Sequence, residues 1–155
     1  ADLRKQYPNF TLDMYGIGQM EDEIRQRIEE LNLKKHVHLK GFVKDKNIYS
    51  QYALLWITSI IEGMPLSIIE AKANAIPVVT TKWGDAVSEI IEDGVNGFII
   101  EKNEDMVKRT KYLLDNEAVL KSFSEAALSD YQRFSPDVAK ERWQEIIGKV
   151  DVPDE

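Results

Sequence analysis

Short apolar runs rich in β-branched residues alternate along the chain with longer segments whose apolar residues recur every three or four positions. The short runs are typical of strands buried in a parallel sheet, and the longer segments are typical of amphipathic helices. We predict strands at residues 10–15, 36–40, 54–58, 77–81 and 98–100. We predict helices at residues 2–7, 20–33, 44–53, 66–74, 103–114, 117–133 and 136–148, with a short one near residue 89. This alternation predicts an α/β fold, a Rossmann-like parallel sheet flanked by helices.

The stretch from residue 58 to residue 74 combines a strand end, a tight turn and a helix start. Gly63 gives the turn its backbone freedom, and Pro65 suits the beginning of a helix because it has no N–H to leave unpaired. Two carboxylates flank this point, Glu62 before the helix and Glu70 inside it, with seven residues between them. This arrangement predicts a ligand site at the amino end of the helix.

Helical spacing divides the residues of this segment between two faces. The polar residues Ser67, Glu70 and Asn74 share one face. We expect the apolar residues Leu66, Ile69 and Ala73 to take another face and to pack on the sheet. The backbone N–H groups of the first turn carry partial positive charge and suit an anion such as a phosphate. These are the N–H groups of Gly63, Met64, Leu66 and Ser67.

Composition and charge exclude several classes of function. The net charge of −7 argues against nucleic acid or an anionic membrane surface as a partner. No apolar run approaches the ~20 residues that a membrane-spanning helix needs. With no cysteine in the chain, neither a disulfide framework nor thiolate chemistry is possible. The absence of a signal-peptide pattern favours a cytoplasmic protein.

Two further patterns are weaker. Gly16 and Gly18 follow the first predicted strand, but a dinucleotide fingerprint would have a third glycine where Glu21 stands. The two glycines therefore indicate a tight strand-to-helix turn. His36 and His38 alternate on a predicted strand, yet we identify no carboxylate or cysteine nearby to complete a metal site, so no metal is expected.

Three ordered blocks resemble a known family. They read E-G-M-P-L-S-I-I-E-A at residues 62–71, A-I-P-V-V-T-T at residues 75–81 and S-E-I-I-E-D-G-V-N-G-F at residues 88–98. Together they resemble the donor half of retaining nucleotide-sugar glycosyltransferases, the family called glycosyl transferases group 1. The similarity extends from about residue 10 to the last helix. It implies the C-terminal half of the two-domain GT-B fold.

The resemblance assigns roles to individual residues. It implies that Glu70 accepts hydrogen bonds from the ribose hydroxyls of the donor nucleotide, and that Glu62 is the catalytic residue beside the transferred sugar. It implies that the remaining donor-binding residues contact the phosphates or the base, and these residues are Gly16, Gly18, Phe42, Val43, Gly63, Met64, Leu66 and Ser67. The family also carries a glutamate at the place of Glu89, which is either a substrate contact or part of a helix cap and ion pair. The terminal helix of the family crosses onto the acceptor domain, so Trp143 and Ile147 are either exposed or packed on their own domain.

The same resemblance implies transfer of a sugar from a nucleotide diphosphate to a hydroxyl acceptor with retained configuration. We expect a UDP-sugar as co-substrate, no separate cofactor, and bacterial cell-surface polysaccharide or glycolipid as product. Residues 1–150 would form the donor domain without its first strand and helix, and residues 151–155 a flexible acidic tail. The partner would be the missing N-terminal acceptor domain, and this part alone would be inactive. The full protein would be cytoplasmic or peripheral at the inner face of the plasma membrane.

Two alternatives stay open on the sequence. One is another GT-B enzyme, such as a sugar-nucleotide epimerase or a phosphorylase, although we identify no lysine for the pyridoxal group of a phosphorylase. The other is a non-catalytic nucleotide-binding module.

Overall fold

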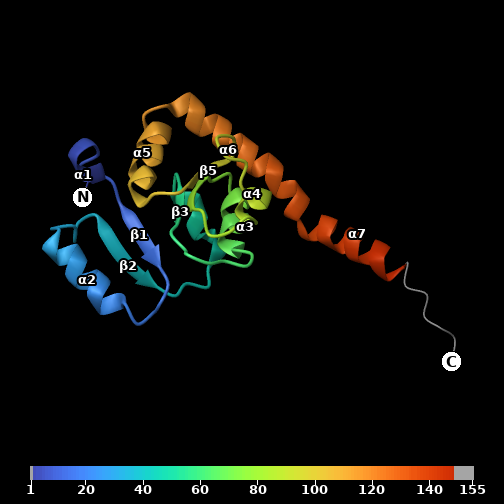
Figure 1. The fold of residues 1–155 in the computed structure, drawn as a ribbon, viewed down its shortest axis with the longest axis horizontal. Coiled ribbons are helices and arrows are strands. Elements are labelled where there is room, and N and C mark those ends of the chain that lie inside the picture. The colour runs from blue at the N-terminus through green and yellow to red at the C-terminus, as the bar shows by residue number, and fades with distance from the viewer. Residues whose placement is uncertain (1, 149–155) are drawn as a thin grey trace. The chain divides into compact units, whose positions relative to one another are not determined.

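The computed structural model describes residues 2–148, which form two compact units (Figure 1). The first unit ends at Ile48 and the second begins at Tyr49. The tail predicted at residues 151–155 lies outside the described residues. Among the described helices, none is both long enough and apolar enough to cross a membrane.

The first unit consists of two parallel strands and two helices. Its elements are α1 (Asp2–Gln6), β1 (Leu12–Tyr15), α2 (Glu21–Glu30) and β2 (Val37–Gly41). The register pairs Leu12 with Val37 and Met14 with Leu39. Its buried apolar side chains are those of Leu3 and Leu33, while α2 buries none of its residues completely.

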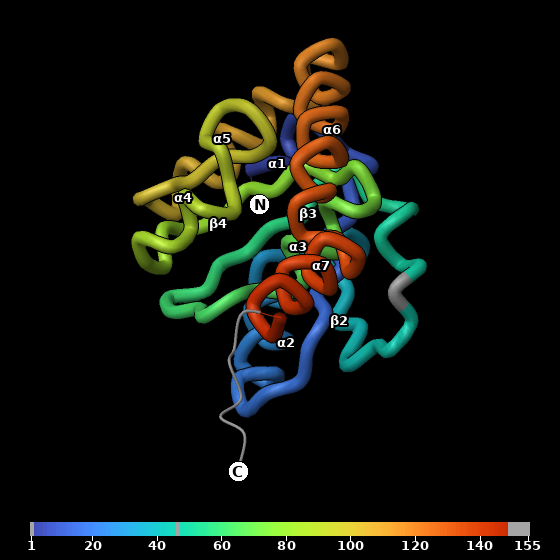
Figure 2. Tube along the Cα trace, turned by 90° about the vertical axis from the view of Figure 1, so that its right-hand side faces the viewer, coloured from blue at the N-terminus to red at the C-terminus, as the bar shows by residue number. Residues whose placement is uncertain are grey.

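The second unit contains a three-stranded parallel sheet in the order β3-β4-β5, and its chain can be followed in Figure 2. The strands are β3 (Leu55–Ile57), β4 (Val78–Thr81) and β5 (Gly97–Ile100). The helices are η1 (Lys46–Gln51), which crosses the boundary between the units, α3 (Leu66–Ala73), α4 (Val87–Ile90), α5 (Asn103–Leu114), α6 (Glu117–Tyr131), η2 (Gln132–Phe134) and α7 (Pro136–Ile147). The α/β fold with parallel strands and flanking helices is therefore confirmed. The strands pair in two sheets, one in each unit.

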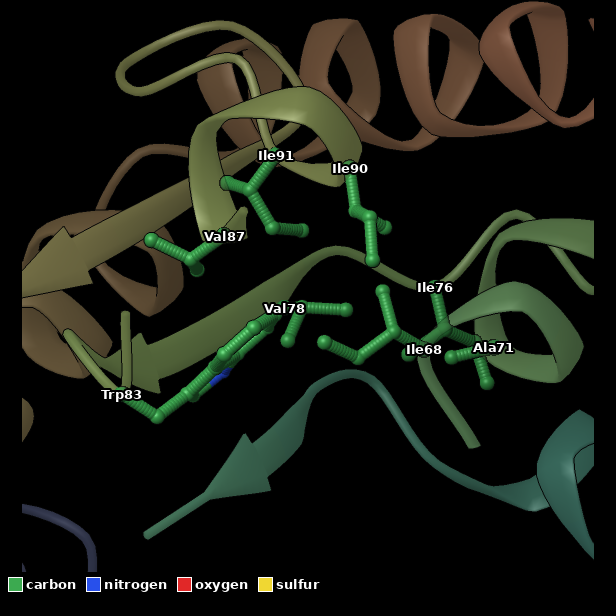
Figure 3. Close-up of a cluster of buried hydrophobic side chains, with 8 residues drawn as sticks. All are labelled: Ile68, Ala71, Ile76, Val78, Trp83, Val87, Ile90 and Ile91. Atoms are coloured by element: carbon green, nitrogen blue, oxygen red, sulfur yellow. The ribbon is translucent and has the colours of Figure 1, made fainter. Parts of the chain in front are cut away.

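The core of the second unit lies on both faces of β4. Neighbouring strand residues point to opposite faces, so Val78 and Val79, both fully buried, enter different clusters. The cluster around Val78 is drawn in Figure 3 and consists of Ile68, Ala71, Ile76, Val78, Trp83, Val87, Ile90 and Ile91. The cluster around Val79 consists of Val79, Phe98, Ile100, Met106, Leu113 and Phe123. Two covered faces explain why β4 is apolar at successive positions.

The last helix begins with a local capping signal and buries none of its described residues. Ser135 accepts a hydrogen bond from the Val138 N–H at 3.4 Å, and Pro136 occupies the first helical position. Trp143 is 64% exposed and Ile147 is 65% exposed. The sequence left open whether these two residues are exposed or packed on their own domain, and the structure shows that they are exposed.

Candidate functional site

The amino end of α3 is open. The chain leaves β3 at Ile57 and enters α3 through Pro65, whose φ of −72° and ψ of 99° are extended and whose side chain provides no cap. The first amide of this turn with a backbone acceptor is that of Ile68, which donates to the Pro65 carbonyl at 3.0 Å. Within residues 2–148, no hydrogen bond is found for the amides of Leu66 and Ser67. Their donors and the helix dipole are available to an anion.

The prediction that Leu66 packs on the sheet is wrong, because this residue is 65% exposed. The helix instead buries Ile68, Ala71 and Lys72 completely, while Ile69 is half-buried against the same core cluster. Apolar residues occur around most of this helix, so their spacing alone does not select one face. The elements around α3 determine which of its faces is buried, because α3 also packs against α6.

Glu70 lies on the half-buried side of α3 and is held from outside the helix. The Tyr49 hydroxyl donates a hydrogen bond to Glu70 Oε2 at 3.0 Å. Burial raises the pKa of Tyr49 well above its usual range, and the hydrogen bond to the Glu70 carboxylate and its negative charge raise it further. Tyr49 is therefore protonated at neutral pH and serves as a donor. Tyr49 could not be predicted from the sequence, since 21 positions separate it from Glu70 and no local pattern relates them.

Two hydrogen bonds from hydroxyl groups position Glu62 and its loop. The Ser59 hydroxyl donates to Glu62 Oε1 at 2.5 Å, and the Thr81 hydroxyl donates to the Ser59 carbonyl at 2.6 Å. Thr81 is the last residue of β4, so the loop that carries Glu62 is tied to the carboxyl end of the sheet. Ligands of open α/β sheets bind at this end.

The predicted residues of this stretch lie together around the first turns of α3. Glu62, Ser67 and Glu70 are half-buried, whereas Gly63, Met64 and Leu66 are exposed. A single segment of the chain therefore presents both carboxylates and the amides of the first helical turn to a ligand.

A buried ionic cluster lies on the side of α3 that packs against α6. Lys72 is 0% exposed, and its Nζ donates to the Ile90 carbonyl and to Asp130 Oδ2. Arg133 Nε donates to Asp130 Oδ1 at 2.7 Å, and Arg133 Nη2 donates to the Glu89 carbonyl. The cluster joins α3, the end of α4 and the end of α6.

Burial lowers the pKa of Lys72, and the adjacent Asp130 opposes this effect. Burial acts to raise the pKa of Asp130, but the hydrogen bonds from Arg133 and Lys72 outweigh it and hold that pKa below its usual value. The Glu89 side chain is exposed, so its carbonyl, and not its carboxylate, belongs to this cluster.

The first unit has a separate set of candidate residues around a cavity of about 200 Å³. Its lining includes the glycine turn and apolar side chains, and the lining residues are Met14, Tyr15, Gly16, Ile17, Gly18, Met20, Glu21, Ile24 and Leu39. Gly16 has a φ of 137°, a conformation that favours glycine, and its N–H donates to the Gly41 carbonyl at 2.9 Å. Phe42 and Val43 follow Gly41 directly and are 67% and 37% exposed.

The two histidines have partners that the sequence analysis did not foresee. His38 Nδ1 lies 2.8 Å from Asp13 Oδ1, a contact that was not predicted from the sequence. The cause is the parallel pairing of β1 with β2, which aligns residues 25 positions apart. His36 Nδ1 lies 3.1 Å from the Phe10 carbonyl. In the part of the chain that the structure describes, no cluster of three metal-ligating side chains occurs.

Comparison with known proteins places this chain in a family. A family described as "Glycosyl transferases group 1" matches residues 1–130. The poly(glycerol-phosphate) alpha-glucosyltransferase of Bacillus subtilis (strain 168) is 33% identical over 149 residues, which cover 94% of this chain and 22% of that protein.

Two solved structures are similar over most of this chain. HepE from Anabaena in complex with UDP has a TM-score of 0.84 and 25% identity, over 92% of this chain and 42% of that chain. The C-terminal domain of the glycosyl transferase group 1 family protein LpcC from Francisella tularensis has a TM-score of 0.73 and 25% identity, over 83% of this chain and 71% of that domain. The chain thus spans about a fifth of the Bacillus enzyme and less than half of HepE. It belongs to the glycosyl transferases group 1 family and has the fold of the C-terminal part of a GT-B enzyme.

Proposed function

We propose that residues 1–150 form the donor-binding domain of an enzyme that transfers a sugar from a UDP-sugar to a hydroxyl acceptor with retention at the anomeric carbon. The observation that carries this proposal is the pair of glutamates on either side of the uncapped amino end of α3. Glu62 and Glu70 are each held by a hydroxyl group, and the amides of Leu66 and Ser67 between them are open to an anion.

The diphosphate, the ribose and the transferred sugar each have a group of matching chemistry in the second unit. The diphosphate binds the amide groups of residues 63–67 other than Pro65, where the helix dipole favours negative charge. Glu70 accepts hydrogen bonds from the ribose hydroxyls, because an ionised carboxylate is an acceptor only. Glu62 lies by the sugar and favours the positive charge that builds on the anomeric carbon.

For the first unit taken by itself, we propose that the glycine turn and the residues after β2 also bind the donor. Gly16 and Gly18 would allow a phosphate to approach the backbone closely, since glycine has no side chain to obstruct it. Phe42 and Val43 would contact the base through their backbone groups. This assignment is supported by their exposure and by the cavity beside the glycine turn.

The chemistry needs no protein nucleophile in this domain. As the bond to the sugar breaks, negative charge develops on the leaving diphosphate, and positioned N–H donors lower the barrier by stabilising that charge. The acceptor would be bound chiefly by the N-terminal domain of the whole enzyme, and closure of the two domains would exclude water.

The named relatives support the substrate class. HepE was solved with UDP, and the Bacillus relative is named for glucosyl transfer to poly(glycerol phosphate). We therefore propose that the whole enzyme glycosylates a bacterial cell-surface polymer or glycolipid, working in the cytoplasm at the inner face of the plasma membrane.

Nucleotide titration followed by amide NMR tests the proposal. UDP, GDP and ADP are added separately to the chain and to two variants, Glu70→Ala and the control Glu125→Ala, which removes an exposed carboxylate from α6. UDP should shift the amides of Gly16, Phe42, Gly63 and Ser67. Glu70→Ala should weaken UDP binding by roughly 1–3 kcal/mol, the cost of losing a hydrogen bond to a charged group, and Glu125→Ala should not.

Two outcomes would contradict the proposal. The ribose role of Glu70 would be excluded by equal UDP affinities for Glu70→Ala and Glu125→Ala. The assignment of uridine would be wrong if GDP or ADP shifted the same amides at lower concentration than UDP.

A further inference from the structure

Tyr49 connects the core of the second unit to Glu70. Its ring packs against the core cluster that contains Ile68 and Ala71, and its backbone carbonyl accepts the N–H of Tyr52, the residue after η1, at 3.0 Å. From this fixed base, the hydroxyl donates to Glu70 Oε2 at 3.0 Å. The side chain is therefore anchored at its ring and at its hydroxyl.

A carboxylate on a helix surface can adopt several rotamers, and binding a ligand through one of them requires the others to be given up. A hydrogen bond from a neutral donor to an ionised carboxylate is stronger than one between neutral groups, so it restricts those rotamers effectively. It occupies only one of the roughly four acceptor positions of a carboxylate. A tyrosine is suited to this task because it is rigid and its polar end projects beyond an apolar ring.

The pKa of Tyr49 agrees with this arrangement. Because the pKa is raised by burial and by Glu70, the hydroxyl keeps its proton over the neutral and mildly alkaline range. A deprotonated tyrosine would repel the carboxylate, whereas the neutral hydroxyl holds it.

We propose that Tyr49 is a positioning residue for nucleotide recognition, which holds the Glu70 carboxylate in the orientation that accepts the ribose hydroxyls of the donor. This inference rests on the proposed function, because it assumes that Glu70 contacts the ribose. It goes further by assigning ribose selectivity to a pair of residues in different elements, η1 and α3.

The test compares binding of UDP with that of 2′-deoxy-UDP, measured by NMR titration of the chain. Four proteins are needed, the unmodified chain, Tyr49→Phe, Glu70→Gln and Tyr112→Phe. Tyr49→Phe removes only the hydroxyl and keeps the ring that packs on the core. Tyr112→Phe is the matched control, since it removes a hydroxyl from a tyrosine on α5 that is 46% exposed and contacts Phe98.

The unmodified chain should bind 2′-deoxy-UDP about tenfold more weakly than UDP, the effect of one lost hydrogen bond to a charged group. Tyr49→Phe should weaken UDP binding about fivefold and reduce the preference for UDP to about threefold, because a loosely held carboxylate recognises the hydroxyl less well. Glu70→Gln should reduce the preference similarly, and Tyr112→Phe should keep it. A purely structural role for Tyr49 would alter stability without altering the ratio of the two affinities.

Two further outcomes distinguish a failure of the positioning role of Tyr49 from a failure of the proposed function. If Glu70→Gln loses the preference for UDP while Tyr49→Phe retains it in full, the positioning role of Tyr49 is wrong and the proposed function stands. If the unmodified chain and Glu70→Gln both bind the two nucleotides equally, Glu70 does not recognise ribose. The proposed function then loses its main support, and the inference about Tyr49 falls with it.

Discussion

The two units of the chain offer different kinds of group to a ligand. In the first unit the candidate residues are glycines and exposed side chains around a cavity, and Leu3 and Leu33 are its buried apolar residues. In the second unit the candidate carboxylates are fixed by hydroxyl groups and stand on a helix whose other side is buried.

The ionic contacts differ in the same way. In the first unit, Lys34 pairs with Glu29 at 2.6 Å with both side chains more than half exposed. In the second unit, the buried Lys72 of α3 pairs with Asp130 of α6. Side chains can be held accurately where the surrounding core is well packed, and a less buried segment contributes chiefly backbone groups. Under the proposed function, we therefore expect the second unit to orient the nucleotide and the first unit to allow close approach of the backbone.

The largest expected effect comes from removing the buried lysine. Lys72→Met leaves Asp130 and the Ile90 carbonyl without their shared donor, and breaking a buried pair in this way costs about 3 kcal/mol or more. The control Lys34→Met removes an exposed lysine of the first unit and should cost less than about 1 kcal/mol. Urea unfolding followed by circular dichroism measures both variants. Equal losses of stability would mean that the ionic contacts of the two units do not differ in energy.

Two glycines provide the next comparison. A Cβ at Gly97 would lie 2.5 Å from the Val78 carbonyl oxygen and 3.1 Å from Ile91 Cγ2, whereas a Cβ at Gly18 would meet nothing within 4 Å. Gly97→Ala should therefore destabilise the chain by about 2 kcal/mol through overpacking. Gly18→Ala should change stability by less than about 0.5 kcal/mol and yet weaken UDP binding if a phosphate approaches this turn.

Circular dichroism melts and UDP titration of the same two samples would separate these effects. A Gly18→Ala variant as unstable as Gly97→Ala would show that the first unit is packed as tightly as the second.

The smallest expected effect concerns acid stability. The pKa of Asp130 is lower in the folded chain than its ordinary value of 3.8, so the unfolded chain binds its proton first as the pH falls. The contribution of Asp130 to stability is therefore present above pH 3.8 and is lost as the pH falls through the folded pKa. Asp130→Asn should be less stable at neutral pH and should lose less stability on acidification.

Urea midpoints at pH 7 and pH 3 measure this difference, with Asp22→Asn as a control that removes an exposed carboxylate from the first unit. If Asp130→Asn loses as much stability on acidification as the unmodified chain does, another group is responsible for the acid sensitivity.

Local features of this protein follow from its sequence. The predicted helix at residues 103–114 is α5 with the same ends, because apolar spacing and polar boundaries act within a few residues. Parallel strands alternating with helices were also predictable. The helix expected at residues 117–133 ends earlier, since α6 gives way to η2 at Gln132, and the helix expected at residues 44–53 is the shorter 3-10 helix η1.

The candidate site was predictable only in part. The spacing of Glu62 and Glu70 around a helix start placed both carboxylates at the amino end of α3. Ser59, the hydroxyl partner of Glu62, lies three positions away in the same loop, but Tyr49, the hydroxyl partner of Glu70, comes from another segment. A sequence pattern carries no signal for such a contact, because it depends on how the elements pack.

The sequence by itself determined the order of the elements, their parallel arrangement and the turn that begins α3. Only the tertiary structure decided which side of α3 is buried. Leu66, the more apolar residue, is exposed, while Lys72 is buried because Asp130 lies 58 positions away in the sequence and beside it in the fold. Lysine is normally expected at the surface, and only a charged partner supplied by another helix makes its burial possible.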